Sequence, residues 1–118
     1  MSLLLALAVA AAGGIGAALR YLADNALPAK VRARYPWGIA VVNLTGSFAL
    51  GALTAILPGV WLTILGTGLL GGYTTFSTAA VDAARLLMER RITAGVIGTL
   101  ATLVGCIALA AAGYALFA

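Results

Sequence analysis

Polar residues recur at helical spacing inside otherwise hydrophobic stretches of this chain. Asn43, Ser47 and Gly51 follow one another at intervals of four residues, so in a helix they share one face. An asparagine amide and a serine hydroxyl on such a face can bond a neighbouring membrane helix. They can also meet a polar solute that crosses the membrane, because polar groups in hydrocarbon need a partner. Both interpretations remain open for this face.

The segment from Gly71 to Thr78 carries a more specific signal. Two glycines precede five hydroxyl-bearing side chains in six residues (YTTFST), a composition that is poor for a helix. Non-helical backbone inside a membrane is tolerated only where it is buried in protein or lines an aqueous cavity. Its freed carbonyl groups can coordinate a cation. A cation site and a simple packing kink are the two interpretations of this segment.

A second polar face combines Gly98, Thr102 and Cys106, again four residues apart, although a threonine hydroxyl can also bond its own helix. All three acidic residues lie at or beyond the ends of the hydrophobic stretches. A path rich in N–H and O–H donors without carboxylates suits a small anion and disfavours a proton-coupled carrier of cations. Arg20, at the end of the first stretch, either adds positive potential at an entrance or anchors its helix at the interface.

The composition excludes a water-soluble enzyme. Of the 118 residues, 64% are hydrophobic and only 8% are charged, whereas soluble domains contain about 25% charged residues. The chain has no histidine and a single cysteine, which excludes zinc catalysis and a histidine base. We therefore expect no catalytic residues. We also expect no nucleic-acid partner. The net charge is +4, but the chain lacks the basic stripe with interleaved aromatic residues that nucleic-acid-binding proteins carry.

Membrane-spanning helices must hold these polar groups. All ten charged residues fall between Arg20 and Arg34 or between Asp82 and Arg91, and about 20 apolar residues suffice to cross a hydrocarbon core of roughly 30 Å. The prediction is a single all-α membrane domain over residues 1–118, with four spans and the third span broken near mid-membrane. The spans are expected at about 3–22, 36–57, 61–87 and 92–116.

The basic residues also predict an orientation. All seven Lys and Arg lie in or beside the connections between spans one and two and between spans three and four. The opposite side, with both termini, carries none. Because basic loops stay in the cytoplasm, both termini are predicted to lie outside the cell membrane. No positive residue precedes Arg20, so the first stretch is expected to be a retained span rather than a signal peptide.

Three segments occur in order along the chain: GGIGAALRY at 13–21, WGIAVVNLTGSF at 37–48 and GGYTTFST at 71–78. At these residues the sequence resembles the CrcB/Fluc family of small fluoride channels. The third segment is the most specific, and with the four-span layout the resemblance covers essentially the whole chain. It implies an antiparallel dimer with two fluoride pathways, through which cells expel fluoride passively.

The resemblance also implies roles for individual residues. In the family, the break in the third span lies at the dimer axis and its backbone carbonyls hold a structural Na⁺. The matching residues here are Gly71 and Thr74. Arg20 would shape the anion vestibule. The residues implied to line the pathway are Asn43, Phe76, Ser77 and Thr102. Fluoride is strongly hydrated, so such a pore must replace water with donors and with the positive edges of aromatic rings.

Two positions depart from the family pattern. Ala79 stands where the family usually has a second Phe, and Ile39 stands where it commonly has a Thr. Homodimers of the family need dual topology with little charge bias, yet all seven basic residues lie on one side here. The resulting hypothesis is one subunit of a heterodimer with an oppositely oriented paralogue. The alternatives are a non-conducting scaffold subunit and a coupled transporter of a small solute, which the missing carboxylate disfavours.

Overall fold

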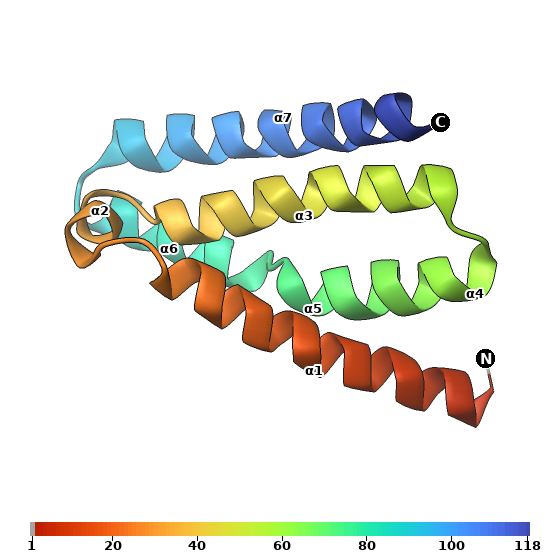
Figure 1. Ribbon diagram of the computed structural model, residues 1–118. Helices are drawn as coiled ribbons and strands as arrows, with labels where there is room; N and C mark the ends of the chain where they lie inside the picture. Colours follow the sequence, from red (N-terminus) through yellow and green to blue (C-terminus); the bar gives the residue numbers. More distant parts are fainter. Residues whose placement is uncertain (1) are drawn as a thin grey trace.

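A computed structural model of the chain describes residues 2–118, and Figure 1 shows that helices make up its framework. The three long helices are α1 (Leu3–Asn25), α3 (Trp37–Ile56) and α7 (Ile92–Phe117). Each of the three is long and apolar enough to cross a membrane. The helical fold class predicted from the sequence is therefore confirmed.

Shorter helical pieces connect α3 to α7. α4 (Gly59–Leu62) continues into η1 (Thr63–Leu70), a wider π-helical stretch, and then into α5 (Gly71–Tyr73). α6 (Ser77–Met88) follows after three non-helical residues. We call these three residues, Thr74 to Phe76, the interruption.

The connection between α1 and α3 is more ordered than the sequence indicates. Helix α1 continues beyond residue 22 to Asn25, whose side-chain amide donates to the Tyr21 carbonyl at 2.8 Å. A short helix, α2 (Ala29–Arg34), then begins directly after Pro28. The polar segment is therefore a helix end and a separate helical turn rather than an open loop.

Glycines set the close spacing of α1 against η1 and α5. Gly16 lies against the backbone of Leu69 and Tyr73, and Gly72 lies against the backbone of Gly13. A Cβ atom at either position would overlap the neighbouring backbone. Small residues of this kind let membrane helices approach closely. This packing brings the end of α1 to the interruption.

Helix α3 lies between α7 and the pieces that run from α4 to α5 (Figure 1). Val42 in α3 is fully buried. Gly51 of α3 lies against the backbone of Ala110, and Gly113 of α7 lies against the backbone of Phe48. On the polar face of α3, Gly51 is buried against α7, whereas Asn43 and Ser47 are half-buried.

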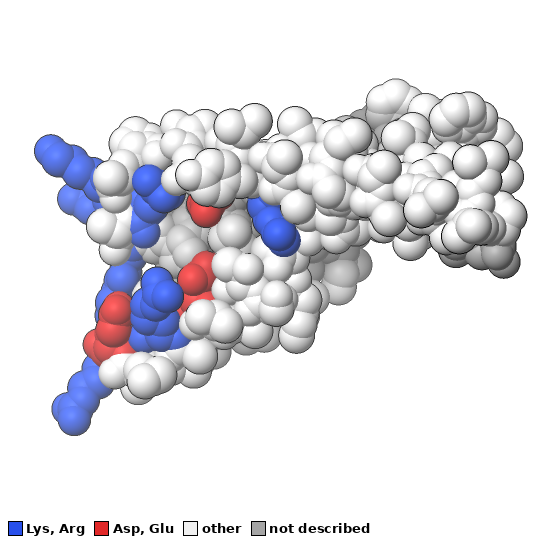
Figure 2. Space-filling view, turned by 90° about the horizontal axis from the view of Figure 1, so that it is seen from below, with Lys and Arg blue, Asp and Glu red and all other residues white. Residues whose placement is uncertain are grey.

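The outer surface is apolar over most of its length. Leu3, Leu4 and Leu116 are 77%, 79% and 72% exposed, and Figure 2 shows the charged side chains confined to one half of the molecule. Both termini lie at the opposite end (Figure 1). Apolar side chains exposed on this scale require nonpolar surroundings. Together with the three long apolar helices, they identify a membrane protein.

Candidate functional site

The interruption is held by specific hydrogen bonds. Thr74 has extended backbone angles, with φ −78° and ψ 160°. Its N–H and its hydroxyl both donate to the Leu70 carbonyl, at 2.9 and 2.8 Å. These two bonds close the preceding helix. The chain then leaves the helical path until Ser77 begins α6.

Asn43 of α3 holds the interruption at Thr75. The Asn43 side-chain nitrogen donates to the Thr75 carbonyl, and the Asn43 side-chain oxygen accepts from the Thr75 N–H, both at 2.9 Å. Thr75 is only 8% exposed, so its backbone groups need such partners. An asparagine amide has two N–H donors. One N–H of Asn43 therefore remains available to a solute.

These hydrogen bonds divert the usual donors of two backbone carbonyls. In a continuous α-helix, Thr75 N–H would donate to Gly71 and Thr78 N–H would donate to Thr74. Instead, Thr75 donates to Asn43, and Thr78 donates to the Thr75 hydroxyl oxygen at 3.2 Å. Gly71 and Thr74 are the two residues that the resemblance marks as Na⁺ ligands. Both carbonyl oxygens thus lack their helical N–H donor, although Thr74 accepts from Arg20. Backbone carbonyl oxygens are ligands that suit an alkali cation.

Arg20 reaches the interruption from α1. Its Nη1 lies 3.4 Å from the Thr74 carbonyl oxygen, and its side chain is half-buried. A guanidinium at this position is within reach of the same carbonyl that the resemblance assigns to a cation. The contact joins the end of α1 to the backbone of the interruption.

Phe76 and Ser77 face outward. Phe76 is 89% exposed. Ser77 is also exposed, and its hydroxyl lies 3.5 Å from that of Thr75. The structure therefore presents an aromatic ring and a hydroxyl at the chain surface beside the clamped backbone.

Thr102 lies apart from this group, on α7. Its hydroxyl donates to the Gly98 carbonyl at 2.8 Å, so toward a passing ion it offers an acceptor rather than a donor. In the described part of the chain, no hydrogen bond joins Thr102 to Asn43, Phe76 or Ser77. The other predicted site residues gather at the interruption, and Thr102 does not.

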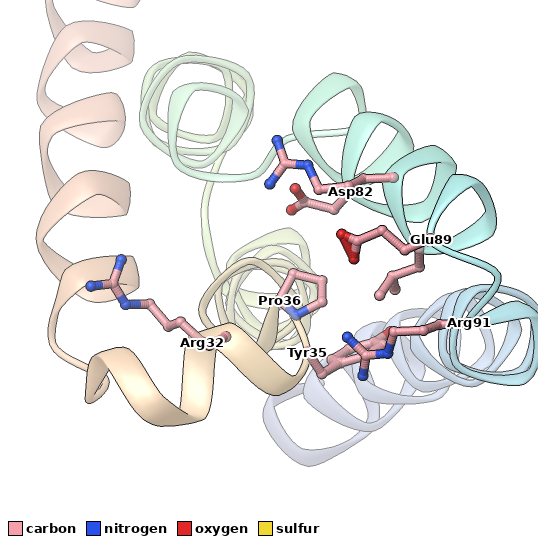
Figure 3. Close-up of a pocket in the computed structure, with 9 residues that line it drawn as sticks. Arg32, Tyr35, Pro36, Asp82, Glu89 and Arg91 are labelled. Atoms are coloured by element: carbon pink, nitrogen blue, oxygen red, sulfur yellow. The ribbon is translucent and has the colours of Figure 1, made fainter.

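The structure also contains a charged cavity of about 180 Å³ that the sequence does not indicate. Figure 3 shows the Asp82 and Glu89 carboxylates pointing into it, whereas the Arg32 guanidinium points away toward α1. Arg85 and Arg91 also line it. The clustering of charges in the two connections was the available signal, but by itself it predicts only orientation.

Comparison with known proteins places this sequence in a family. Residues 7–114 match the family model described as CrcB-like protein, Camphor Resistance (CrcB). The chain is 43% identical over 122 residues to the fluoride-specific ion channel FluC 1 of Leifsonia xyli subsp. xyli, an alignment that covers 99% of this chain and 88% of the relative.

Two further relatives have similar names. The fluoride-specific ion channel FluC of Rhodospirillum centenum is 43% identical over 113 residues, with 91% of this chain and 86% of the relative covered. The FluC 2 channel of Nocardia farcinica is 40% identical over 116 residues, with 93% and 79% covered. The relatives are ion channels rather than enzymes, which confirms the expectation of no enzyme activity. The family match includes all three motif segments, and the chain belongs to the CrcB family.

Proposed function

We propose that this chain is a pore-forming subunit of a fluoride-specific channel that lets a cell lose fluoride passively. Relatives that align with nearly its whole length are named fluoride-specific ion channels. The observation that carries the proposal is the pair of hydrogen bonds between Asn43 and Thr75. This clamp keeps a free N–H donor, an exposed aromatic ring and two carbonyls together at one interruption.

The proposed channel has four spans in one domain of each chain. The first, second and fourth spans are α1, α3 and α7, and the third runs from α4 through α6 with the interruption near mid-membrane. Two chains pair in antiparallel orientation around the interruption. The exposure of Phe76, 89% in the single chain, supports a second subunit at this place, because an aromatic ring gains from burial against a partner.

A structural Na⁺ is proposed at the dimer axis, bound by the Gly71 and Thr74 carbonyls. The diverted N–H groups of Thr75 and Thr78 support this site, because they leave both oxygens without their helical donors. Residues 2–118 contain no cluster of three His, Cys, Asp or Glu side chains that could hold a metal ion. A bound Na⁺ supplies a fixed positive charge at the place where the two interruptions meet.

The proposed anion path follows from the hydration of fluoride. A pore must replace tightly held water with N–H and O–H donors and with the positive edges of aromatic rings. Asn43 provides its second N–H, Ser77 provides a hydroxyl, and Phe76 provides a ring edge. Arg20 raises the positive potential at the vestibule. Thr102 joins this path as a donor only if its hydroxyl turns away from Gly98.

The direction of transport follows from the membrane potential. The termini are proposed to lie outside the cell membrane, with the basic connections in the cytoplasm. An inside-negative potential favours exit of an anion by about 2.3 kcal/mol per charge per 100 mV. A passive channel therefore lowers cytoplasmic fluoride without a coupled ion.

The proposed partner is an oppositely oriented paralogue. All seven basic residues of this chain belong to one end, whereas an antiparallel dimer needs a subunit of each orientation. Ala79 removes one aromatic ring, and a ring from the partner would complete the pathway that uses Phe76. The names FluC 1 and FluC 2 among the relatives fit organisms that encode two such chains.

A scaffold role is the second candidate, and Ala79 is the observation that favours it. A subunit without the second ring would retain the Na⁺ site and the interface while its partner supplied the working pore. Both roles require assembly with the paralogue. They differ in whether the anion meets Phe76 and Asn43 of this chain.

Growth of a bacterium that lacks its own fluoride exporters tests the proposal. The chain, its paralogue and the pair are each expressed, and growth is followed at increasing fluoride. We expect the pair to restore growth. Robust rescue by this chain alone would retain the channel and reject the heterodimer. If the pair reaches the membrane but gives no rescue, fluoride export is rejected.

A further inference from the structure

Tyr35 lies where the charged cavity of Figure 3 meets an apolar groove. The groove measures about 300 Å³ and runs along α7 past Gly98 to Thr102. Of the described residues, Tyr35 is the one that lines both the cavity and the groove. Tyr35 therefore lies between the charged cavity and the part of α7 that carries Gly98 and Thr102.

The Tyr35 side chain occupies the space that a side chain at position 98 would need. A Cβ atom placed on Gly98 would overlap the hydroxyl and the ring of Tyr35. Gly98 is the first member of the face that Thr102 and Cys106 continue at helical spacing. Tyr35, which lies between α2 and α3, therefore supplies a hydroxyl at a position where α7 itself has only hydrogen.

This hydroxyl is free to donate. Thr102 uses its own proton in the bond to Gly98, and the Cys106 thiol is a weak donor. Within residues 2–118, the Tyr35 hydroxyl takes part in no hydrogen bond. A strong hydrogen-bond donor on this face of α7 is thus available from Tyr35.

Neighbouring contacts hold the Tyr35 ring in position. The ring packs against Trp37 with centroids 4.8 Å apart and planes inclined at 54°. Arg91, at the start of α7, donates to the Arg34 carbonyl. This bond ties Arg34, the residue before Tyr35, to the start of α7.

We propose that Tyr35 is the first hydroxyl donor that an anion meets when it moves between the charged cavity and the polar face of α7. The hydroxyl replaces the one that a serine or threonine at position 98 would supply. This inference rests on the proposed fluoride function and names a specificity-determining residue for it. A small, strongly basic anion gains most from such a donor, because hydrogen bonds to charged groups are the strong ones.

Nuclear magnetic resonance of tyrosine labelled with ¹³C at Cζ tests the contact directly. The chain has four tyrosines, and a Tyr→Phe variant of each assigns its signal in the assembled channel. We expect the Tyr35 signal to shift when chloride is replaced by fluoride, while the Tyr114 signal stays in place. A Tyr35 signal that does not respond to fluoride would overturn the inference.

Transport measurements supply a second test. Tyr35→Phe removes only the hydroxyl, and we expect fluoride flux to fall roughly tenfold, as for the loss of one hydrogen bond to a charged group. Tyr114→Phe, at the far end of α7, is the matched control. Partial recovery in Tyr35→Ala/Gly98→Ser, relative to Tyr35→Ala, would support a hydroxyl at this place.

The outcomes separate the inference from the proposed function. Equal fluoride flux in Tyr35→Phe and in the parent channel would overturn the role of Tyr35 and leave the channel intact. A parent channel that carries no fluoride would contradict the proposed function. In that case the fluoride-dependent shift of the Tyr35 signal still decides whether an anion meets this hydroxyl.

Discussion

Asn43 in α3 and Thr75 in the interruption exchange two hydrogen bonds of 2.9 Å, although 32 residues separate them in the chain. The bonds join α3 to the interruption. There the backbone N–H of Thr75 donates to Asn43 instead of to a helical carbonyl. Asn43 therefore fixes the course of the interruption and still keeps one N–H for a solute.

Asn43→Asp is expected to destabilise the chain and abolish fluoride flux. An aspartate can accept from the Thr75 N–H but, when ionised, cannot donate to the Thr75 carbonyl, and it adds a negative charge to an anion path. The unsatisfied buried carbonyl should cost about 1–3 kcal/mol, which thermal unfolding of the purified protein measures. Ser47→Ala, one turn along the same face, is the control. An unfolding temperature equal to the parent's would refute the clamp.

Gly16→Ala is expected to destabilise the chain, whereas Gly14→Ala is not. A Cβ at Gly16 overlaps the backbone of Leu69, but a Cβ at Gly14 meets nothing within 4 Å. The overlap should cost about 1–3 kcal/mol, whereas Ala is favoured over Gly in an open helix position by roughly 0.5–1 kcal/mol. Thermal unfolding of both variants checks the difference. Equal stability would mean that α1 does not pack this closely against η1.

Phe76→Ile is expected to lower fluoride flux by roughly tenfold, because the aliphatic side chain lacks the positive ring edge that contributes about 0.5–1.5 kcal/mol in aromatic contacts. The ring is 89% exposed in the single chain, so the helix content should not change. Flux is measured in the assembled channel and helix content by circular dichroism. Unchanged flux would favour the scaffold role of this chain.

The N-terminus is expected to be labelled from outside the cell. In a Cys106→Ala background, Ser2→Cys should react with a membrane-impermeant maleimide on intact cells, and Lys30→Cys should react only after lysis. The physical reason is the retention of basic connections in the cytoplasm. Labelling of both positions on intact cells would indicate dual orientation and would remove the main support for a heterodimer.

Much of the helical framework is predictable from the sequence. The expected segments 3–22, 36–57 and 92–116 lie close to α1, α3 and α7, because apolar runs end where charged residues or proline begin. At the end of α1, the Asn25 side chain donates to the Tyr21 carbonyl. Hydrophobic periodicity does not predict such a bond. Helix α2 was also unpredicted, since its charged sequence has no apolar face of its own.

The residue types of the site are visible in the sequence, but their contacts are not. Glycine and hydroxyl composition indicates irregular backbone near residues 71–78, and the structure narrows it to the interruption. The partnership of Asn43 with Thr75 depends on how α3 packs, which local spacing does not encode. The place of Tyr35 over Gly98 is hidden for the same reason, because it joins two distant parts of the chain.

Fluoride efflux from proteoliposomes tests the central claim most directly. Vesicles loaded with fluoride or chloride receive the chain together with its oppositely oriented paralogue, and anion release is followed with an ion-selective electrode after addition of a potassium ionophore. We predict fast release of fluoride, no release of chloride above empty vesicles, and loss of the fluoride signal with Asn43→Asp. Fluoride release no faster than from empty vesicles, with the protein assembled and inserted, would contradict the account.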